Sequence, residues 1–322
     1  MTSTTTRRVF FAACAAAGLL AASCDAGDRP PPAAARRELT AQWQDVFDGT
    51  PELYAVVRPQ AIKRDQVYGA LFKALVRVAQ ARTEMRGVTS LEAMEGCEEI
   101  VIGIRKDAQG EDAAIVFRGV PASLDPSKMT DASGRQILRL IDGRAKTQEF
   151  EWRDRRNTEA GSMFVLPDRT WVGAMGEARA RARQAFASPF GRPAPKSDPE
   201  ALASVRLDAA SFFSSARFQK SAIVGPLTRK LRALTISLRP GKTGLVTTLE
   251  YQDEDASAWA EMHVKRVIEE LAQIEPRPGR PNLSWLKGAV VGHEGSAVTV
   301  KVAVPPRLLE ELPNATGGDL PL

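Results

Sequence analysis

Apolar residues recur along this chain at two different spacings, which predict a mixture of helices and strands. Spacings of three and four residues predict amphipathic helices over 67–82 and 256–274. Strict alternation with polar residues predicts strands instead, as over 99–105 and 298–304. Because both kinds of segment are interspersed along the chain, the pattern favours an α+β fold.

The same helical and strand spacings of apolar residues predict the remaining elements. The polar segment 107–112 predicts a turn that joins two strands as a hairpin. In the first half we expect further strands and helices, in chain order at 53–58, 113–118, 133–140 (helix), 150–152, 163–166, 170–174 and 177–187 (helix). In the second half we expect them at 203–209, 212–232 (helix), 234–238, 244–251, 289–291 and 307–312 (helix).

The two halves show a similar order of elements. Residues 203–209 also resemble residues 55–61, with Ala, Val, Arg and Ala in register. We therefore predict two similar α+β units, each an antiparallel sheet with helices packed on one face. An internal duplication is one explanation; the other is that many α+β chains share such an order.

Proline-rich segments mark the predicted boundaries. Residues 189–199 form a linker between a first unit at 43–188 and a second at 200–312. Residues 25–42, rich in Pro and Ala, predict an extended tether. Residues 313–322 are expected to form a flexible tail.

The N-terminus has the layout of an export signal. Arg7 and Arg8 precede an apolar run over 10–22. This run is shorter than the roughly 20 apolar residues that a spanning helix needs, and it is typical of a signal peptide.

Two short motifs in this segment resemble known bacterial signals. Residues 6–11, with the pair Arg7 and Arg8, resemble a twin-arginine export signal. Residues 20–24 resemble the cleavage box of a bacterial lipoprotein, although Ala21 stands where Leu or Val is usual. The resemblance implies a signal peptide over 1–24, lipidation of Cys24, and an anchored body in the cell envelope that faces the periplasm or the exterior. It leaves open the choice between the twin-arginine and the general route, and between the inner and the outer membrane.

Charge and cysteine content bear on whether the protein binds nucleic acid and whether it contains a disulfide bond. The 322 residues carry a formal charge of +5, and removal of Arg7 and Arg8 with the signal leaves +3. Basic and acidic residues are interspersed, so we expect no nucleic-acid partner. Cys97 is the single cysteine of the predicted body, which excludes an internal disulfide there.

A search for catalytic and metal-binding motifs predicts no catalytic residue, cofactor or metal. His263 is expected on a helix and His293 in a turn between strands, without zinc-ligand spacing. Residues 239–243 contain Gly-Lys-Thr but join two predicted strands, which favours a hairpin turn over a phosphate loop. Cys97 lies among carboxylates that disfavour its thiolate.

These observations predict a non-catalytic, membrane-anchored envelope lipoprotein that binds a protein partner or serves as a scaffold. One alternative is a carrier or chaperone of an apolar ligand such as lipid, which would need an apolar cavity of several hundred Å³. A second alternative is a hydrolase that uses paired carboxylates, such as Glu98 with Glu99.

Overall fold

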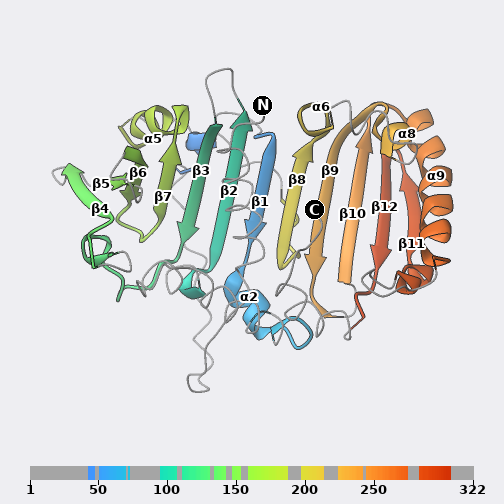
Figure 1. The fold of residues 1–322 in the computed structure, drawn as a ribbon, viewed down its shortest axis with the longest axis horizontal. Helices are drawn as coiled ribbons and strands as arrows, with labels where there is room; N and C mark the ends of the chain where they lie inside the picture. Colours follow the sequence, from blue (N-terminus) through green and yellow to red (C-terminus); the bar gives the residue numbers. More distant parts are fainter. Residues whose placement is uncertain are drawn as a thin grey trace. The chain divides into compact units, whose positions relative to one another are not determined.

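The protein consists mainly of antiparallel strands, as Figure 1 shows. The computed structural model describes residues 43–47, 51–69, 72, 95–106, 111–130, 134–142, 147–153, 159–187, 197–213, 224–241, 244–274 and 283–305. The strands form a 12-stranded sheet in the order β11-β12-β10-β9-β8-β1-β2-β3-β7-β6-β5-β4.

This strand order corrects the predicted fold class. Two similar α+β units with separate sheets were expected, whereas strands from both halves of the chain belong to one sheet with few helices. The prediction was wrong because periodicity identifies a strand but not its neighbours. β1 (Leu53–Val57) is buried at every position, although successive side chains of a strand point to opposite faces of the sheet. Of the described strands, the first half of the chain contributes seven to this sheet and the second half five.

Contacts group the chain into two compact units, which are described separately. The first comprises Met1–Pro51, Val56–Arg64 and Gly69–Lys196. The second comprises Glu52–Ala55, Asp65–Tyr68 and Ser197–Leu322. Most of the predicted linker 189–199 lies outside the described residues, as do the signal peptide 1–24, the tether 25–42 and the tail 313–322.

The first unit pairs its strands antiparallel and packs α5 and η1 against them. Its elements are η1 (Trp43–Phe47), α2 (Pro59–Arg64), β2 (Glu99–Lys106), β3 (Glu111–Arg118), η2 (Pro126–Lys128), β4 (Leu138–Asp142), β5 (Gln148–Arg153), β6 (Glu159–Val165), β7 (Trp171–Met175) and α5 (Glu177–Ala187). The predicted hairpin of β2 and β3 is confirmed, with Ile102 opposite Ile115. α5 packs on β3, β6, β7 and η1.

One predicted helix in this unit is wrong. Residues 133–140 were expected to be helical, but Leu138–Asp142 forms β4, with Leu138 opposite Trp152 and Leu140 opposite Phe150. A short segment with several apolar residues fits both periods, and pairing with β5 decides between them. Most of the predicted helix 67–82 lies outside the described residues.

The second unit carries one long helix on its strands. Its elements are β8 (Ala203–Asp208), α6 (Ala209–Phe212), α8 (Val224–Thr228), β9 (Leu231–Arg239), β10 (Gly244–Tyr251), α9 (Glu254–Ala272), η4 (Ser284–Gly288), β11 (Val290–Glu294) and β12 (Ala297–Val302). The predicted helix 212–232 extends too far, because Lys230 adopts a positive φ of 57° and β9 begins at Leu231.

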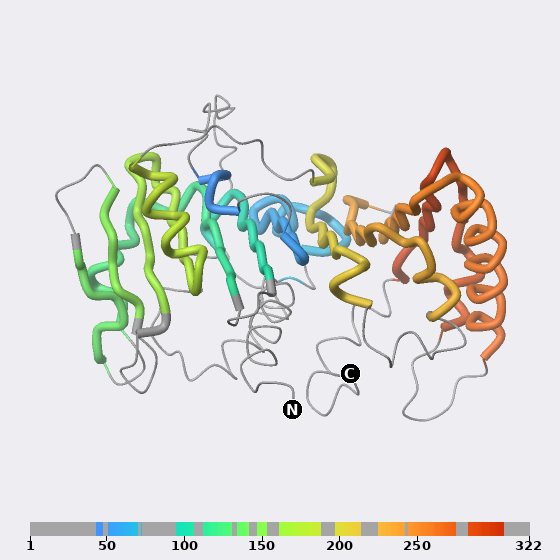
Figure 2. Tube along the Cα trace, turned by 90° about the horizontal axis from the view of Figure 1, so that it is seen from above, coloured from blue at the N-terminus to red at the C-terminus, as the bar shows by residue number. Residues whose placement is uncertain are grey.

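α9 packs against β10, β11 and β12, beside which it runs in Figure 2. Register places Leu234, Leu249 and Val298 in one row of the sheet face, and these residues pack with Ala260 of the helix. The Asp253 side chain caps α9 by accepting a hydrogen bond from the Ala256 N–H at 2.8 Å. This packing leaves the C-terminal half of α9 beside β11 and η4.

Candidate functional site

The residues that carry the predicted export and lipidation lie outside the described part of the chain. Arg7, Arg8 and Cys24 all precede Trp43, so their roles remain predictions. Among the described residues, no group of three or more His, Cys, Asp or Glu side chains could hold a metal ion. No described helix combines the length and apolar character needed to cross a membrane.

An open groove of about 360 Å³ lies between the C-terminal half of α9, η4 and the start of β11. Its apolar lining comes from all three elements and consists of Ile268, Ala272, Leu286, Ala289 and Val291. The groove forms because α9 ends at Ala272 while the chain returns through η4 to pair β11 with β12. Its volume lies at the lower end of the range for small-molecule pockets.

Polar side chains complete the lining of this groove. Lys265 and Glu269 come from α9, Gln273 follows its last residue, and Lys287 comes from η4. The Lys265 ammonium donates a hydrogen bond to Glu261 at 2.9 Å, and this contact lowers the pKa of Glu261. Lys287 forms no ion pair with any described residue. The groove therefore combines an apolar surface with two lysines and one glutamate.

The outer face of α9 exposes two large apolar side chains one turn apart. Met262 is 66% exposed and Trp259 is 44% exposed. The Trp259 ring stacks on His263, with centroids 5.0 Å apart and planes inclined by 14°. The helical position predicted for His263 is confirmed, and stacking on Trp259 accounts for its orientation.

His293 and Ser257 form a pair that resembles a nucleophile and its base at first sight. The Ser257 Oγ lies 2.9 Å from His293 Nε2 and 2.8 Å from the carbonyl oxygens of both Glu254 and Gly295. His293 Nε2 lies 2.7 Å from the Gly295 oxygen. The predicted turn position of His293 is wrong, because His293 lies in β11, one residue before that strand ends at Glu294.

The geometry of this pair opposes nucleophilic catalysis. A carbonyl oxygen only accepts hydrogen bonds, so the short contact with Gly295 places a proton on Nε2. A serine nucleophile instead needs an unprotonated ring nitrogen as its base. Ser257 is also 0% exposed. The pair therefore joins the first turn of α9 to the β11–β12 turn.

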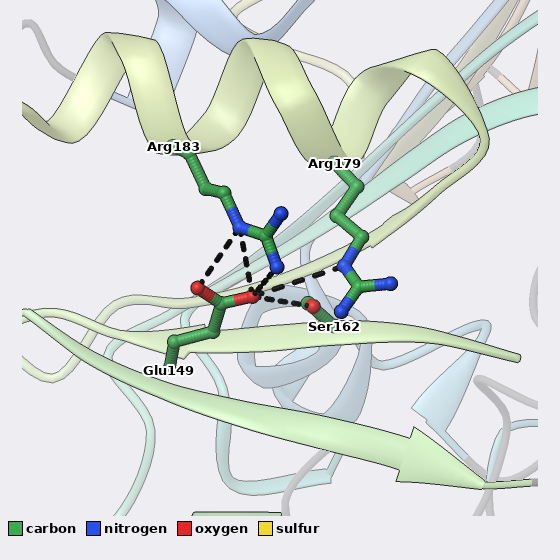
Figure 3. Close-up of polar contacts among 4 residues, drawn as sticks. All are labelled: Glu149, Ser162, Arg179 and Arg183. Atoms are coloured by element: carbon green, nitrogen blue, oxygen red, sulfur yellow. Dashed lines mark hydrogen bonds and ion pairs between the residues drawn. The ribbon is translucent and has the colours of Figure 1, made fainter. Parts of the chain in front are cut away.

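Glu149 lies at the centre of a charged cluster between the sheet and α5 (Figure 3). Arg183 donates to both of its carboxylate oxygens, at 2.7 and 3.1 Å, and the Ser162 hydroxyl donates at 2.7 Å. Arg179 lies one turn before Arg183 and approaches the carboxylate to 3.8 Å. Burial raises the pKa of Glu149, but these hydrogen bonds and the two arginine charges outweigh burial and lower it.

Asp112 forms a second charged contact with α5. Its Oδ1 accepts a hydrogen bond from the Ala178 N–H at 2.6 Å, and its Oδ2 pairs with Arg181. Arg181 also donates to the Val46 carbonyl oxygen at 3.1 Å. The structure pairs the arginines at 179, 181 and 183 with carboxylates of the sheet, which the sequence analysis did not anticipate.

Glu99 takes part in a third cluster and is not available as a free carboxylate. It accepts a hydrogen bond from Arg58 at 3.2 Å and pairs with Arg118. The Arg118 guanidinium lies 5.7 Å from the ring centroid of Trp43. This arrangement ties η1 and the residue after β1 to the β2–β3 hairpin.

Two further candidates from the sequence analysis are Cys97 and the Gly-Lys-Thr segment. Cys97 is 0% exposed, and burial together with the charge of Glu98 raises its pKa to about 12. Arg239 ends β9, Gly244 begins β10, and the two strands pair antiparallel as the predicted hairpin requires. Lys242 and Thr243 themselves lie outside the described residues.

Comparisons with known proteins show a likeness in fold only. No protein-family model matches the sequence, and no curated protein matches it. Crystal form III of TP0453 is similar in structure, with a TM-score of 0.51 at 10% sequence identity, over 84% of this chain and 97% of that one. Crystal form I gives a TM-score of 0.49 at 9% identity, over 84% and 96% of the two chains. The chain thus shares a fold with TP0453 at a sequence identity too low to transfer a function.

Proposed function

We propose that this protein is a non-catalytic envelope lipoprotein whose body binds a small apolar ligand in the α9–η4–β11 groove. The groove is the observation that supports binding, because five apolar side chains from three elements line one open volume of about 360 Å³. Most small-molecule sites combine such a surface with a few polar groups. This proposal favours the carrier role over a scaffold without a ligand.

The envelope location is proposed from the sequence. Arg7 and Arg8 would direct export, Cys24 would carry the lipid, and residues 25–42 would separate the body from the bilayer. In extended form such a tether spans about 3 Å per residue. A carrier on a tether can exchange an apolar ligand with the membrane that holds it.

The anchor is tested by intact mass and fractionation of the full chain expressed in a bacterial host. We expect an acyl mass increment and membrane association, both lost in Cys24→Ala and retained in the matched control Cys14→Ala. Replacement of Arg7 and Arg8 by lysines separates the two export routes, because only twin-arginine export depends on the arginine pair. An unmodified Cys24 in the wild type would refute the anchor.

The groove is tested by native mass spectrometry of the full chain after gentle extraction from its membranes. We expect a co-purifying apolar small molecule in the wild type. Ala289→Phe should exclude it, because Ala289 lines the groove. Ala303→Phe adds the same side chain at an exposed position after β12 and should retain the ligand. Absence of any small molecule, together with no binding of added apolar ligands, would refute the proposal.

A second candidate is a protein-binding role, which the exposed Trp259 and Met262 favour. The same preparation distinguishes it from the carrier. A co-purifying protein that is lost in Met262→Asp but retained in Ala289→Phe would assign binding to the outer face of α9. Loss of the small molecule in Ala289→Phe alone would assign binding to the groove.

A further inference from the structure

We infer that the groove ligand is an anionic amphiphile with a single acyl chain, an inference that rests on the proposed function above. The chain would lie on Ile268, Leu286 and Val291, and the acidic head would lie at Lys265 and Lys287. A fatty acid and a single-chain phospholipid with net negative charge both have this chemistry.

Charge complementarity supports an anionic head. Two lysines and one glutamate line the groove, so its charged lining residues carry a net charge of +1, which favours an anionic ligand. Lys287 forms no ion pair with any described residue. Lys265 pairs with Glu261, but the Lys265 side chain is 51% exposed, and exposed pairs contribute little. Lys265 can therefore exchange Glu261 for a ligand headgroup at small cost.

Position along α9 also favours Lys265 over the C-terminal end of the helix as a contact for the acidic head. The last carbonyl groups of a helix repel anions, and Ala272 at the end of α9 is part of the lining. Lys265 lies seven residues before that end, or about 10 Å along the helix axis. An acidic head is thus more stable near Lys265 than near Gln273.

Groove size favours one chain over two. The volume of about 360 Å³ is at the lower end for ligand pockets, and the openness of the groove allows a chain to extend past it. Beyond the three side chains on which the first chain would lie, the described lining offers a second chain only the small apolar side chains of Ala272 and Ala289. We therefore expect single-chain ligands and not the two-chain lipids that form most of a membrane.

The test compares a C16 fatty acid with the C16 alcohol, which has the same chain and no charge. Each competes against a fluorescent fatty acid bound to the full chain in a non-ionic detergent at low salt. We expect the acid to bind more tightly. Lys265→Gln and Lys287→Gln should each weaken binding of the acid by about two- to fivefold and leave binding of the alcohol unchanged. Glu269→Gln should strengthen binding of the acid by a similar factor. Added salt should reduce the effects of all three substitutions.

The possible outcomes separate this inference from the proposed function. Equal binding of acid and alcohol, unaffected by the three charge variants, would overturn the anionic head while the groove remains a ligand site. Failure of both ligands to bind would overturn the proposed function and this inference together. If the acid binds, a single-chain phospholipid of net negative charge that competes more strongly would identify a phosphate head, and weaker competition a carboxylate.

Discussion

The arginines of α5 show how the surroundings of a residue set its role. In sequence, Arg179, Arg181 and Arg183 alternate with alanine and suggest a solvent-exposed helix. In the fold, Glu149 on β5 and Asp112 on β3 lie opposite them and form ion pairs. Glu149 could not be singled out beforehand, because its partners are 30 and 34 residues away in the chain. These contacts connect α5 to the sheet.

Glu149→Gln should lower the free energy of unfolding by about 1–3 kcal/mol at neutral pH, because two arginines lose their carboxylate partner. The side chain of Glu149 is only 13% exposed, so water does not replace this partner fully. The pKa of Glu149 is lowered in the folded state. Its contribution is therefore complete above the unfolded carboxyl pKa of about 4.3 and is lost as the pH falls through the lower folded pKa.

Urea unfolding of wild type and Glu149→Gln between pH 7 and pH 3 checks this prediction. The difference between the two proteins should shrink toward the acidic end. Glu294→Gln, at an exposed position of β11, serves as the control and should change little at any pH. A difference that is constant with pH would show that the Glu149 charge does not stabilise the fold.

Gly103→Ala should destabilise the first unit by about 1–3 kcal/mol. A Cβ atom at Gly103 would lie 2.3 Å from the ring of Phe47 and 3.0 Å from Pro51, so η1 would have to move away from β2. Gly292→Ala on β11 meets nothing within 4 Å and is the matched control. Thermal unfolding of both variants measures the difference, and equal melting temperatures would contradict the close contact of η1 with β2.

At the scale of elements, the sequence predicted α5 and α9 well but misassigned β4 and the end of the helix predicted at 212–232. The bounds 177–187 of α5 are confirmed as predicted, and α9 is shifted by only two residues at each end. β4 was mistaken for a helix, because the spacings among the apolar residues 137, 138, 140 and 141 fit either period over so short a segment. Pairing with β5 supplies the backbone hydrogen bonds that decide the conformation.

Ala182→Leu should destabilise the protein by about 1–3 kcal/mol, because Ala182 is fully buried where α5 packs on the sheet. Ala178 and Ala185 share this buried face, so α5 lies close to the strands and leaves no room for a larger side chain. Ala180→Leu places the same group on the exposed side of α5 and should stay within about 0.5 kcal/mol of wild type. Urea unfolding measures both variants, and equal effects would contradict the close approach of α5.

At the scale of the whole molecule, sheet membership was the feature that the sequence could not provide. The local order of strand, helix and hairpin is similar in the two halves, which suggested two sheets. The strand order instead places β1 between β2 and β8. Such pairings join strands far apart in the chain, and any exposed strand edge offers the same backbone groups.

Cys97 should report unfolding of the body through its thiol. In a variant with Cys14→Ser and Cys24→Ser, a thiol reagent should not react with the native protein at neutral pH, because Cys97 is buried and its pKa is raised to about 12. Across a urea titration, the labelled fraction should follow the loss of secondary structure measured by circular dichroism. Rapid labelling in the absence of urea would contradict the burial of Cys97, and Cys97→Ala gives the background.

The sequence by itself determined the local features: the apolar periods of β2, β3, α5 and α9, the turn between β9 and β10, and the predicted export segment with Arg7, Arg8 and Cys24. Each of these depends on neighbours in the chain. Only the tertiary structure decided the 12-stranded order, the carboxylate partners of the α5 arginines, and the groove between α9, η4 and β11. These features depend on contacts between distant segments, which pattern and composition do not encode.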